Sequence, residues 1–391
     1  MTESGKEKAR GLGTRAVHAG ERQEVPRRPA VVPIYQTAPF LFDDAAELEV
    51  GFTTSGYPGL YSRYSNPTVR VVEEKIAALE GCDDGVAFAS GMAAITGTLS
   101  TFLRSGDRLL AAADIYGGTD AWLGWLADHH PEVAIERVDV RHLAEHLERA
   151  DGTYRVVYFE TPTNPVLTCC DIGRVARAAH ARGALAVIDN TFASPVLQRP
   201  AELGADLVVH SATKFLAGHS DLTAGLVAGP ADLIKPVRTT MIWGGACLDP
   251  HAAFLLARGM RTLALRVERQ SQNAARLVEL LSGHRRVLRI HYPGLDPIGR
   301  AQMKAGGAML AFDLDGGAEA AARLVDRLQV LQIIPSLGGV ESGVSLPSAT
   351  SHRLLTPEQR AEAGITDGTV RVSCGIEDAD DLLADLEQAL G

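Results

Sequence analysis

Short apolar runs of strand length alternate with amphipathic stretches between Tyr64 and about Leu256. The strand-like runs are Val86-Phe88, Arg108-Ala112, Arg155-Phe159, Ala184-Asp189 and Asp206-His210, and helix-like segments such as 68–80 and 173–182 lie between them. Strands and helices that alternate in this way form a mostly parallel sheet covered by helices. The sequence therefore predicts an α/β fold with a doubly wound sheet.

The two ends of the chain have different patterns. The first 60 residues are rich in proline and glycine with little periodicity, which indicates an extended arm. A long helix over 257–281 is followed by strands near 309–313 and 370–373 and a closing helix over 377–390. We expect an arm over 1–60, a main domain over 61–256, and a smaller α+β domain over 257–391.

Composition argues against several classes of protein. The net charge of −10 carries no basic stripe, so nucleic acid and anionic membranes are not expected partners. No apolar stretch has the length of a membrane span, and the polar start lacks the apolar region of a signal peptide, so we expect a cytoplasmic protein. The five cysteines are odd in number and form no C-x-x-C pair, which predicts free thiols.

The side chains with the clearest chemistry follow two of the predicted strands. Asp189 ends one apolar run, and Ser211, Thr213 and Lys214 follow the next. Ligands of open α/β sheets bind at the carboxyl ends of the strands, so these groups should lie at one edge. A lysine that forms a Schiff base, hydroxyls that bind phosphate and a carboxylate that keeps a pyridine protonated are the requirements of pyridoxal 5'-phosphate. We predict that Lys214 carries this cofactor and that Asp189 contacts its ring nitrogen.

Two other segments are suited to a phosphate group. Gly91 and Met92 follow the strand Val86-Phe88 and begin an apolar helix, and backbone N–H groups at a helix N-terminus attract phosphate. Arg63, two residues after Tyr61, offers a planar guanidinium that can bind phosphate through two hydrogen bonds.

Two further motifs match the patterns of other enzyme classes. Ser211-Ala-Thr-Lys214 matches the S-x-x-K pattern of serine acyl enzymes, but the companion S-D-N and K-T-G motifs are absent and Asp189 would have no role. His142-Leu-Ala-Glu145-His146 matches the H-x-x-E-H pattern of some zinc peptidases. Because an apolar stripe adjoins it and no third ligand follows, we interpret it as a solvated helix face and expect no metal.

A longer series of motifs occurs in order along the chain. They are Tyr61-Ser-Arg63-x-x-Asn66-Pro-Thr68, Ser90-Gly-Met-Ala-Ala, Asp114-x-Tyr116-Gly-Gly-Thr119, Glu160-Thr-Pro-Thr-Asn164-Pro, Asp189-Asn-Thr191, Ser211-x-Thr213-Lys214, Gly218-His-Ser-Asp221, Ser336-Leu-Gly-Gly-Val-Glu341-Ser342 and Arg371-Val-Ser-x-Gly-Ile-Glu-Asp378. On these motifs, from about Thr14 to its end, the chain resembles the Cys/Met-metabolism family of pyridoxal phosphate enzymes. That family includes cystathionine γ-synthase, cystathionine γ- and β-lyases, methionine γ-lyase and O-acetylhomoserine sulfhydrylase.

The resemblance implies a fold, an assembly and a set of site residues. The fold would be the type I aminotransferase-like fold, and the assembly a homotetramer made of two tight dimers. Tyr61 and Arg63 would reach across the dimer to the partner's phosphate. The phosphate site would be completed by Gly91, Met92, Ser211 and Thr213.

The resemblance also implies roles around the cofactor ring and the substrate. Tyr116 would stack on the ring and protonate the leaving sulfur, and Asn164 would lie near the ring hydroxyl. Arg371 and Ser342 would hold the substrate carboxylate, for which a planar guanidinium is well suited.

The substrate is suggested by the residues expected at its distal end. Leu60 precedes Tyr61, and Asp120-Ala121 stands where cystathionine enzymes often have an arginine, so an apolar tail fits best. We therefore expect γ-elimination of L-methionine to methanethiol, 2-oxobutanoate and ammonia. Gly118 and Met241 depart from the cysteine and lysine typical of methionine γ-lyases. Cystathionine γ-lyase, cystathionine γ-synthase and O-acetylhomoserine sulfhydrylase therefore remain alternatives, and a non-catalytic homologue is a more remote one.

Overall fold

A computed structural model describes residues 10–21, 29–53, 59–353 and 355–391 of the chain. The chain divides into two compact units, the first built from Met1–Phe102 and Leu207–Leu263, and the second from Leu103–Asp206 and Ala264–Gly391. The domain boundaries expected after residues 60 and 256 stay predictions.

The first unit contains three buried strands in the order β1-β7-β6, with both neighbouring pairs antiparallel. They are β1 (Asp84–Phe88), β7 (Gly225–Gly229) and β6 (Leu207–Ser211). Helices α4 (Pro67–Glu80), α5 (Gly91–Phe102) and α10 (Ala231–Gly244) pack against these strands, and α11 (Pro250–Met260) packs against α4. Strand β7 was not expected, because two of its five residues are glycines, which favour turns over strands. Its complete burial explains why it forms nonetheless.

The amino-terminal segment is less extended than predicted, because it forms α2 (Leu12–His18) and α3 (Ala45–Thr53). Residues 1–9, 22–28 and 54–58 of the predicted arm lie outside the described residues. The buried Lys75 of α4 anchors the start of the segment, since its Nζ donates to the Ala16 carbonyl (2.8 Å) and lies 3.1 Å from Glu21. Arg261 pairs with the same Glu21 carboxylate.

The second unit begins with four parallel strands in the order β5-β4-β2-β3. These are β5 (Leu185–Asp189), β4 (Val156–Glu160), β2 (Arg108–Ala112) and β3 (Ala134–Val138), with helices α6 (Gly117–His129), α7 (Leu143–Arg149), α8 (Ile172–Ala181) and the short α9 (Ser194–Leu197). Every residue of β4 is buried, as expected for a strand covered on both faces. Strand β3 was not predicted, because it has only partial burial and no continuous apolar run.

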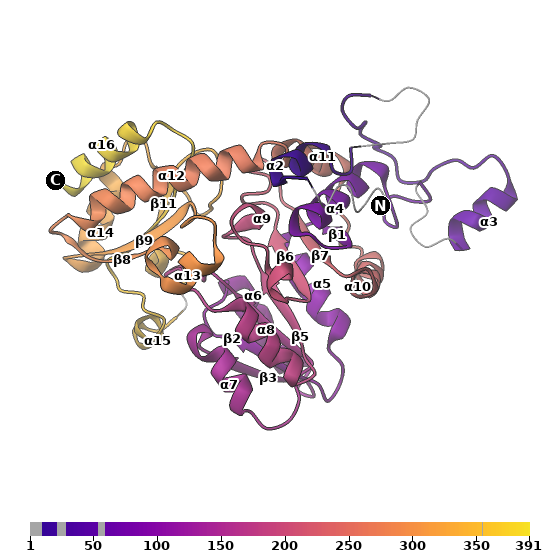
Figure 1. The fold of residues 1–391 in the computed structure, drawn as a ribbon, viewed down its shortest axis with the longest axis horizontal. Helices are drawn as coiled ribbons and strands as arrows, with labels where there is room; N and C mark the ends of the chain where they lie inside the picture. Colours follow the sequence, from indigo (N-terminus) through magenta and orange to yellow (C-terminus); the bar gives the residue numbers. More distant parts are fainter. Residues whose placement is uncertain (1–9, 22–28, 54–58, 354) are drawn as a thin grey trace. The chain divides into compact units, whose positions relative to one another are not determined.

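The rest of the second unit is a five-stranded sheet in the order β10-β11-β12-β9-β8, made of β10 (Gln332–Ile333), β11 (Gly343–Ser345), β12 (Thr369–Ser373), β9 (Met309–Leu314) and β8 (Val287–His291). Helices α12 (Leu263–Ser282), α14 (Gly317–Arg327) and α16 (Ala379–Leu390) share one apolar core with it (Figure 1). The unit also contains α13 (Pro297–Gln302), α15 (Pro357–Glu362) and short 3₁₀ turns, of which Val140–His142 (η1) and Pro347–Ala349 (η4) matter below.

The long helix predicted over 257–281 is in fact two helices, because α11 ends at Met260 and α12 begins at Leu263. Asp249 caps α11 by accepting from the N–H groups of His251 and Ala252, a start signal that the prediction missed. All five cysteines are free, as predicted. No helix among the described residues has both the length and the apolar character needed to cross a membrane.

Candidate active site

The first unit brings Gly91 and Ser211 together at the start of α5. A Cβ atom at residue 91 would lie only 2.7 Å from both Cβ and Oγ of Ser211, so the close approach requires glycine. The Ser90 hydroxyl accepts from the Ala93 N–H (3.1 Å), whereas the N–H groups of Gly91 and Met92 find no acceptor among the described residues. A cradle with unsatisfied N–H groups at a helix N-terminus fits the phosphate of pyridoxal phosphate.

Lys214 lies just beyond the carboxyl end of β6, in a turn that fixes its backbone. Its N–H donates to the Ser211 carbonyl (3.1 Å), and its carbonyl accepts from the Gly218 N–H (2.8 Å). Thr213 is engaged differently from the prediction, since its hydroxyl accepts from the Ala224 N–H (3.0 Å) and donates to the Ala224 carbonyl (3.3 Å). To donate to a phosphate oxygen, this hydroxyl would have to leave the Ala224 carbonyl.

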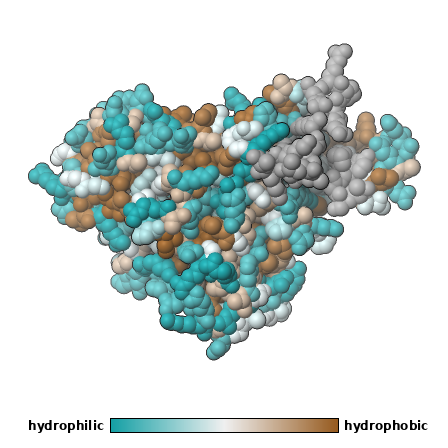
Figure 2. All heavy atoms as spheres, viewed as in Figure 1, coloured by the Kyte–Doolittle hydropathy of each residue, from teal (hydrophilic) through white to brown (hydrophobic). Residues whose placement is uncertain are grey.

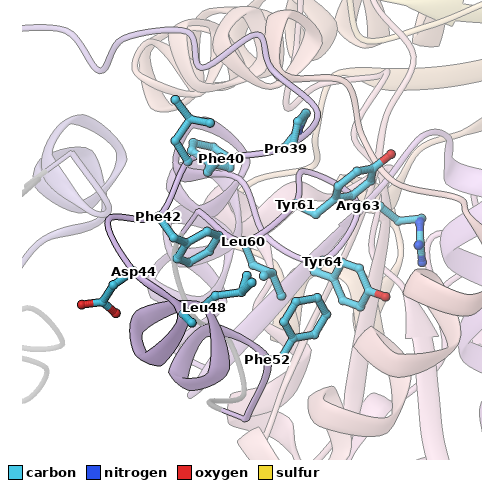
Figure 3. A pocket seen from close by; sticks show the side chains of 12 residues that line it. Pro39, Phe40, Phe42, Asp44, Leu48, Phe52, Leu60, Tyr61, Arg63 and Tyr64 are labelled. Atoms are coloured by element: carbon cyan, nitrogen blue, oxygen red, sulfur yellow. The ribbon is translucent and has the colours of Figure 1, made fainter.

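Tyr61 and Arg63 lie beside an apolar hollow of about 680 Å³, shown in Figure 3. Nη1 of Arg63 donates to the Ile242 carbonyl (3.0 Å), and the guanidinium lies 4.7 Å from the ring centroid of Tyr64. Arg63 is therefore held by one hydrogen bond and by an aromatic face, which leaves most of its N–H groups for an anion.

Large apolar side chains remain exposed around this hollow. Leu41 is 99% exposed and Phe52 is 66% exposed, and both line the hollow together with Leu60. Figure 2 shows apolar atoms among the exposed side chains at the α3 end of the first unit. Exposed apolar surface of this kind marks an interaction site.

In the second unit, Asp189 and Glu160 end neighbouring parallel strands and are register partners. Asp189 is buried, and its Oδ1 accepts from the Thr191 N–H (2.9 Å). Burial, and then the charge of Asp189, raise the pKa of Glu160 well above its ordinary value. Glu160 thus takes up a proton more readily than an ordinary glutamate, beside the carboxylate predicted to face the cofactor ring.

Glu160 also holds Tyr116, the residue predicted to stack on the ring. Its Oε1 accepts from the Tyr116 N–H (2.9 Å), and Tyr116 is the residue that precedes α6. The Tyr116 side chain is half exposed and is available to a ligand. The prediction gave Glu160 no role, although its place at the end of a strand is the signal that identified Asp189.

Arg371 and Asn164 also lie together in the second unit. Arg371 belongs to β12 and is buried, and its Nη1 donates to Oδ1 of Asn164 (2.7 Å). Burial lowers the pKa of Arg371 to about 10. No carboxylate among the described residues forms an ion pair with it, and a buried cation without an anion is costly. The site therefore fits the carboxylate of a ligand.

The Ser342 hydroxyl, by contrast, already has hydrogen-bond partners, Glu377 and Gly375. Its hydroxyl donates to Oε2 of Glu377 (2.8 Å), its N–H donates to Oε1 of Glu377 (2.5 Å), and its oxygen accepts from the Gly375 N–H (2.8 Å). Both donors of Ser342 thus point at Glu377.

The H-x-x-E-H segment is engaged in surface ion pairs. His142 ends η1, whereas His146 lies in α7, 2.9 Å from the Glu136 carboxylate. Glu145 pairs with Arg149. No group of three metal-ligating side chains occurs in the described part of the chain.

Within each unit, then, predicted site residues meet: Gly91 with Ser211, and Arg371 with Asn164. The arrangement of Lys214 and the phosphate cradle relative to Asp189 and Arg371, which lie in different units, stays a prediction.

Comparison with known proteins agrees with this chemistry. Residues 13–391 match the family described as Cys/Met metabolism PLP-dependent enzymes. The chain is 44% identical to an L-methionine gamma-lyase of Pseudomonas putida, over 99% of this chain and 98% of that protein. It is 40% identical to cystathionine gamma-synthase 1 of Nicotiana tabacum, over 97% of this chain and 71% of that protein.

The crystal structure of a cystathionine gamma synthase from Xanthomonas oryzae pv. oryzae superimposes with a TM-score of 0.91 at 38% identity, covering 97% of this chain and 98% of that one. The predicted fold class and the predicted cofactor, pyridoxal phosphate, are thereby confirmed. The chain belongs to the Cys/Met metabolism family of PLP-dependent enzymes.

Proposed function

We propose that this enzyme catalyses the γ-elimination of L-methionine, which consumes water and yields methanethiol, 2-oxobutanoate and ammonia. Relatives named L-methionine gamma-lyase support the proposal, among them the protein of Pseudomonas putida at 44% identity and one of Fusobacterium nucleatum at 41%. The observation that carries it is the apolar surrounding of Leu60, the residue before Tyr61. Leu60 shares its hollow with Phe42, Phe52 and Tyr64 (Figure 3).

An apolar surrounding favours the S-methyl end of methionine over the charged end of cystathionine. Burying an ammonium or carboxylate there without a partner would cost several kcal/mol, on the order of the penalty for a buried, unpaired polar group. Among the described lining residues, the one carboxylate, Asp44, is exposed, and the one cation, Arg63, is assigned to a phosphate.

The residues of the second unit bind the amino-acid end of the substrate. Arg371 holds the α-carboxylate, with Asn164 fixing one edge of the guanidinium. Ser342 joins Arg371 at the carboxylate if its hydroxyl leaves Glu377, to which it donates in this structure. The Tyr116 hydroxyl donates a proton to the leaving thiolate, and Glu160 positions the backbone of Tyr116.

The cofactor residues divide between binding and proton transfer. Pyridoxal phosphate, when bound, supplies the electron sink that makes the α and β protons of the substrate acidic. The Lys214 amine carries the cofactor and then moves those protons, while the Asp189 carboxylate keeps the ring nitrogen protonated. Gly91, Met92 and Ser211 bind the phosphate, and Thr213 joins them if its hydroxyl leaves Ala224.

Tyr61 and Arg63 act on the phosphate of a second subunit, in a homotetramer of two tight dimers. The exposed apolar hollow beside them supports this assembly, because a second copy would cover it. Mixing Arg63→Ala with Lys214→Ala tests it. Random pairing of two inactive variants should restore about one quarter of the wild-type activity if sites are shared across a two-fold axis, and none if they are not.

A cytoplasmic location is also part of the proposal. Five cysteines without a disulfide support it, since free thiols are typical of reducing compartments.

Cleavage or synthesis of cystathionine is the second candidate. Gly118 and Met241 replace the cysteine and lysine that methionine γ-lyases typically carry, and the fold similarity to a cystathionine gamma synthase is high.

The substitution Leu60→Glu tests the choice between the two. A carboxylate in the apolar hollow should lower kcat/KM for methionine about tenfold or more, and should improve the relative use of cystathionine, whose distal ammonium it can meet. Leu60→Met is the matched control and should stay within about threefold of wild type. An unchanged preference in Leu60→Glu would show that this hollow does not receive the substrate.

A further inference from the structure

His352 is a buried histidine to which the proposed reaction gives no role. It lies in the loop after η4, and its backbone N–H donates to the Pro347 carbonyl (2.9 Å). Its side chain is only 8% exposed, which is unusual for a polar residue in a loop between secondary-structure elements.

Three groups surround its imidazole ring. Nδ1 lies 2.8 Å from the Ser351 hydroxyl. The backbone of Asn164 and the charge of Arg371 also act on the ring. Asn164 in turn accepts from Arg371. His352 is therefore under the influence of both residues to which we assign the substrate carboxylate.

The ring is neutral in this environment. Burial, and then the Arg371 cation, lower the pKa of His352 to about 4. A neutral ring can accept from the Ser351 hydroxyl through Nδ1. The uncharged ring can hold its neighbours in place without forming an ion pair with Arg371.

The same loop touches the segment that carries Tyr116. A Cβ atom at Gly117 would lie 3.1 Å from the Ser351 carbonyl, so the loop packs against the start of α6. One short loop thus packs against the start of α6 and interacts electrostatically with the pair Asn164 and Arg371.

We propose that His352, held by Ser351, is a positioning residue of the substrate site: it fixes Asn164 beside Arg371 and keeps the guanidinium free for the α-carboxylate. The inference rests on the proposed binding of an amino acid at Arg371. It does not depend on which amino acid is the natural substrate.

Two unreactive ligands that differ only in the α-carboxylate measure how much that carboxylate contributes to binding. L-Norleucine has the shape of methionine but no sulfur to expel, and n-pentylamine is the same molecule without its carboxylate. Their dissociation constants are read from the change in visible absorbance of the cofactor-loaded enzyme. In His352→Glu, a carboxylate beside Arg371 competes with the ligand, so norleucine should bind about tenfold or more weakly while pentylamine stays within about twofold.

Controls separate this role from a general effect on folding. His352→Gln keeps a neutral hydrogen-bonding side chain and should bind norleucine within about threefold of wild type. Arg353→Gln changes an exposed neighbour in the same loop and should leave both ligands unaffected. If His352→Glu does not hold the cofactor, Ser351→Ala decides, with norleucine weakened about fivefold or more and pentylamine unchanged.

Equal effects on the two ligands, or no effect on either, would overturn the role of His352. Failure of the wild-type enzyme to release methanethiol from methionine would overturn the proposed function instead. In that case the ratio of the dissociation constants of norleucine and pentylamine would still test whether His352 acts on carboxylate binding.

Discussion

The contact between Gly91 and Ser211 gives a sharp test of the phosphate cradle. In Gly91→Ala, the new methyl group would lie 2.7 Å from Cβ and Oγ of Ser211 and 2.9 Å from its Cα, so side-chain rotation alone cannot relieve the clash. Overpacking of this kind destabilises proteins by about 1–3 kcal/mol. Alanine in place of glycine in a helix returns up to about 1 kcal/mol. We expect a net loss of about 1–2 kcal/mol in the free energy of unfolding.

The effect on the cofactor should be larger than the effect on folding. The first turn of α5 and the end of β6 would move apart, and a charge-assisted hydrogen bond to phosphate contributes about 1.5–3 kcal/mol. Losing one such bond weakens pyridoxal phosphate by about 10- to 100-fold.

Cofactor-free protein can be titrated with pyridoxal phosphate and with pyridoxal, which lacks the phosphate. Gly91→Ala should weaken only the phosphorylated compound. Gly124→Ala is the control, because a Cβ there meets no atom within 4 Å in the middle of α6. Unchanged affinity for pyridoxal phosphate in Gly91→Ala, or an equal loss for both compounds, would refute the assignment of the cradle.

Three further outcomes follow from buried titratable groups. Because the pKa of Glu160 is raised in the folded protein, the wild type should lose stability as pH rises above the ordinary glutamate value. Denaturant unfolding of Glu160→Gln should lack this loss, and an identical pH dependence would contradict it. Because the pKa of His352 is lowered to about 4 from an ordinary value of 6.5, its contribution to stability is complete above pH 6.5 and is lost as pH falls toward 4. Unfolding of His352→Gln at pH 5 and pH 8 should show a smaller difference than wild type. A thiol reagent should modify at most Cys247 in the native enzyme and all five cysteines after denaturation, and rapid modification of a second thiol would contradict the burial of the other four.

The sequence was most informative where local pattern and burial agree. The strands ending at Asp189 and near Ser211 were predicted within a residue or two, because continuous apolar runs bounded by turn residues leave few alternatives. Gly91 was identified from its place between a strand and a helix. The structure adds that Ser211 is the reason why no larger residue fits.

The features that were missed depend on tertiary contacts. Strand β7 has a glycine at each end and forms because both of its neighbours pair with it. The break between α11 and α12 was missed although Gly259 stands one residue before the end of α11, because a single glycine is also tolerated inside a helix. His352 is a single histidine in a loop, and its proposed role follows only from the influence of Asn164 and Arg371 on its ring. No periodicity in the sequence encodes that influence.

Turnover of two substrates in parallel tests the central claim most directly. The purified, cofactor-loaded enzyme is given L-methionine and L-cystathionine at equal concentration, and methanethiol and 2-oxobutanoate are measured in each reaction. The account predicts equimolar methanethiol and 2-oxobutanoate from methionine, at a rate well above that of 2-oxobutanoate from cystathionine. Faster release from cystathionine, or no release from either substrate, would contradict it.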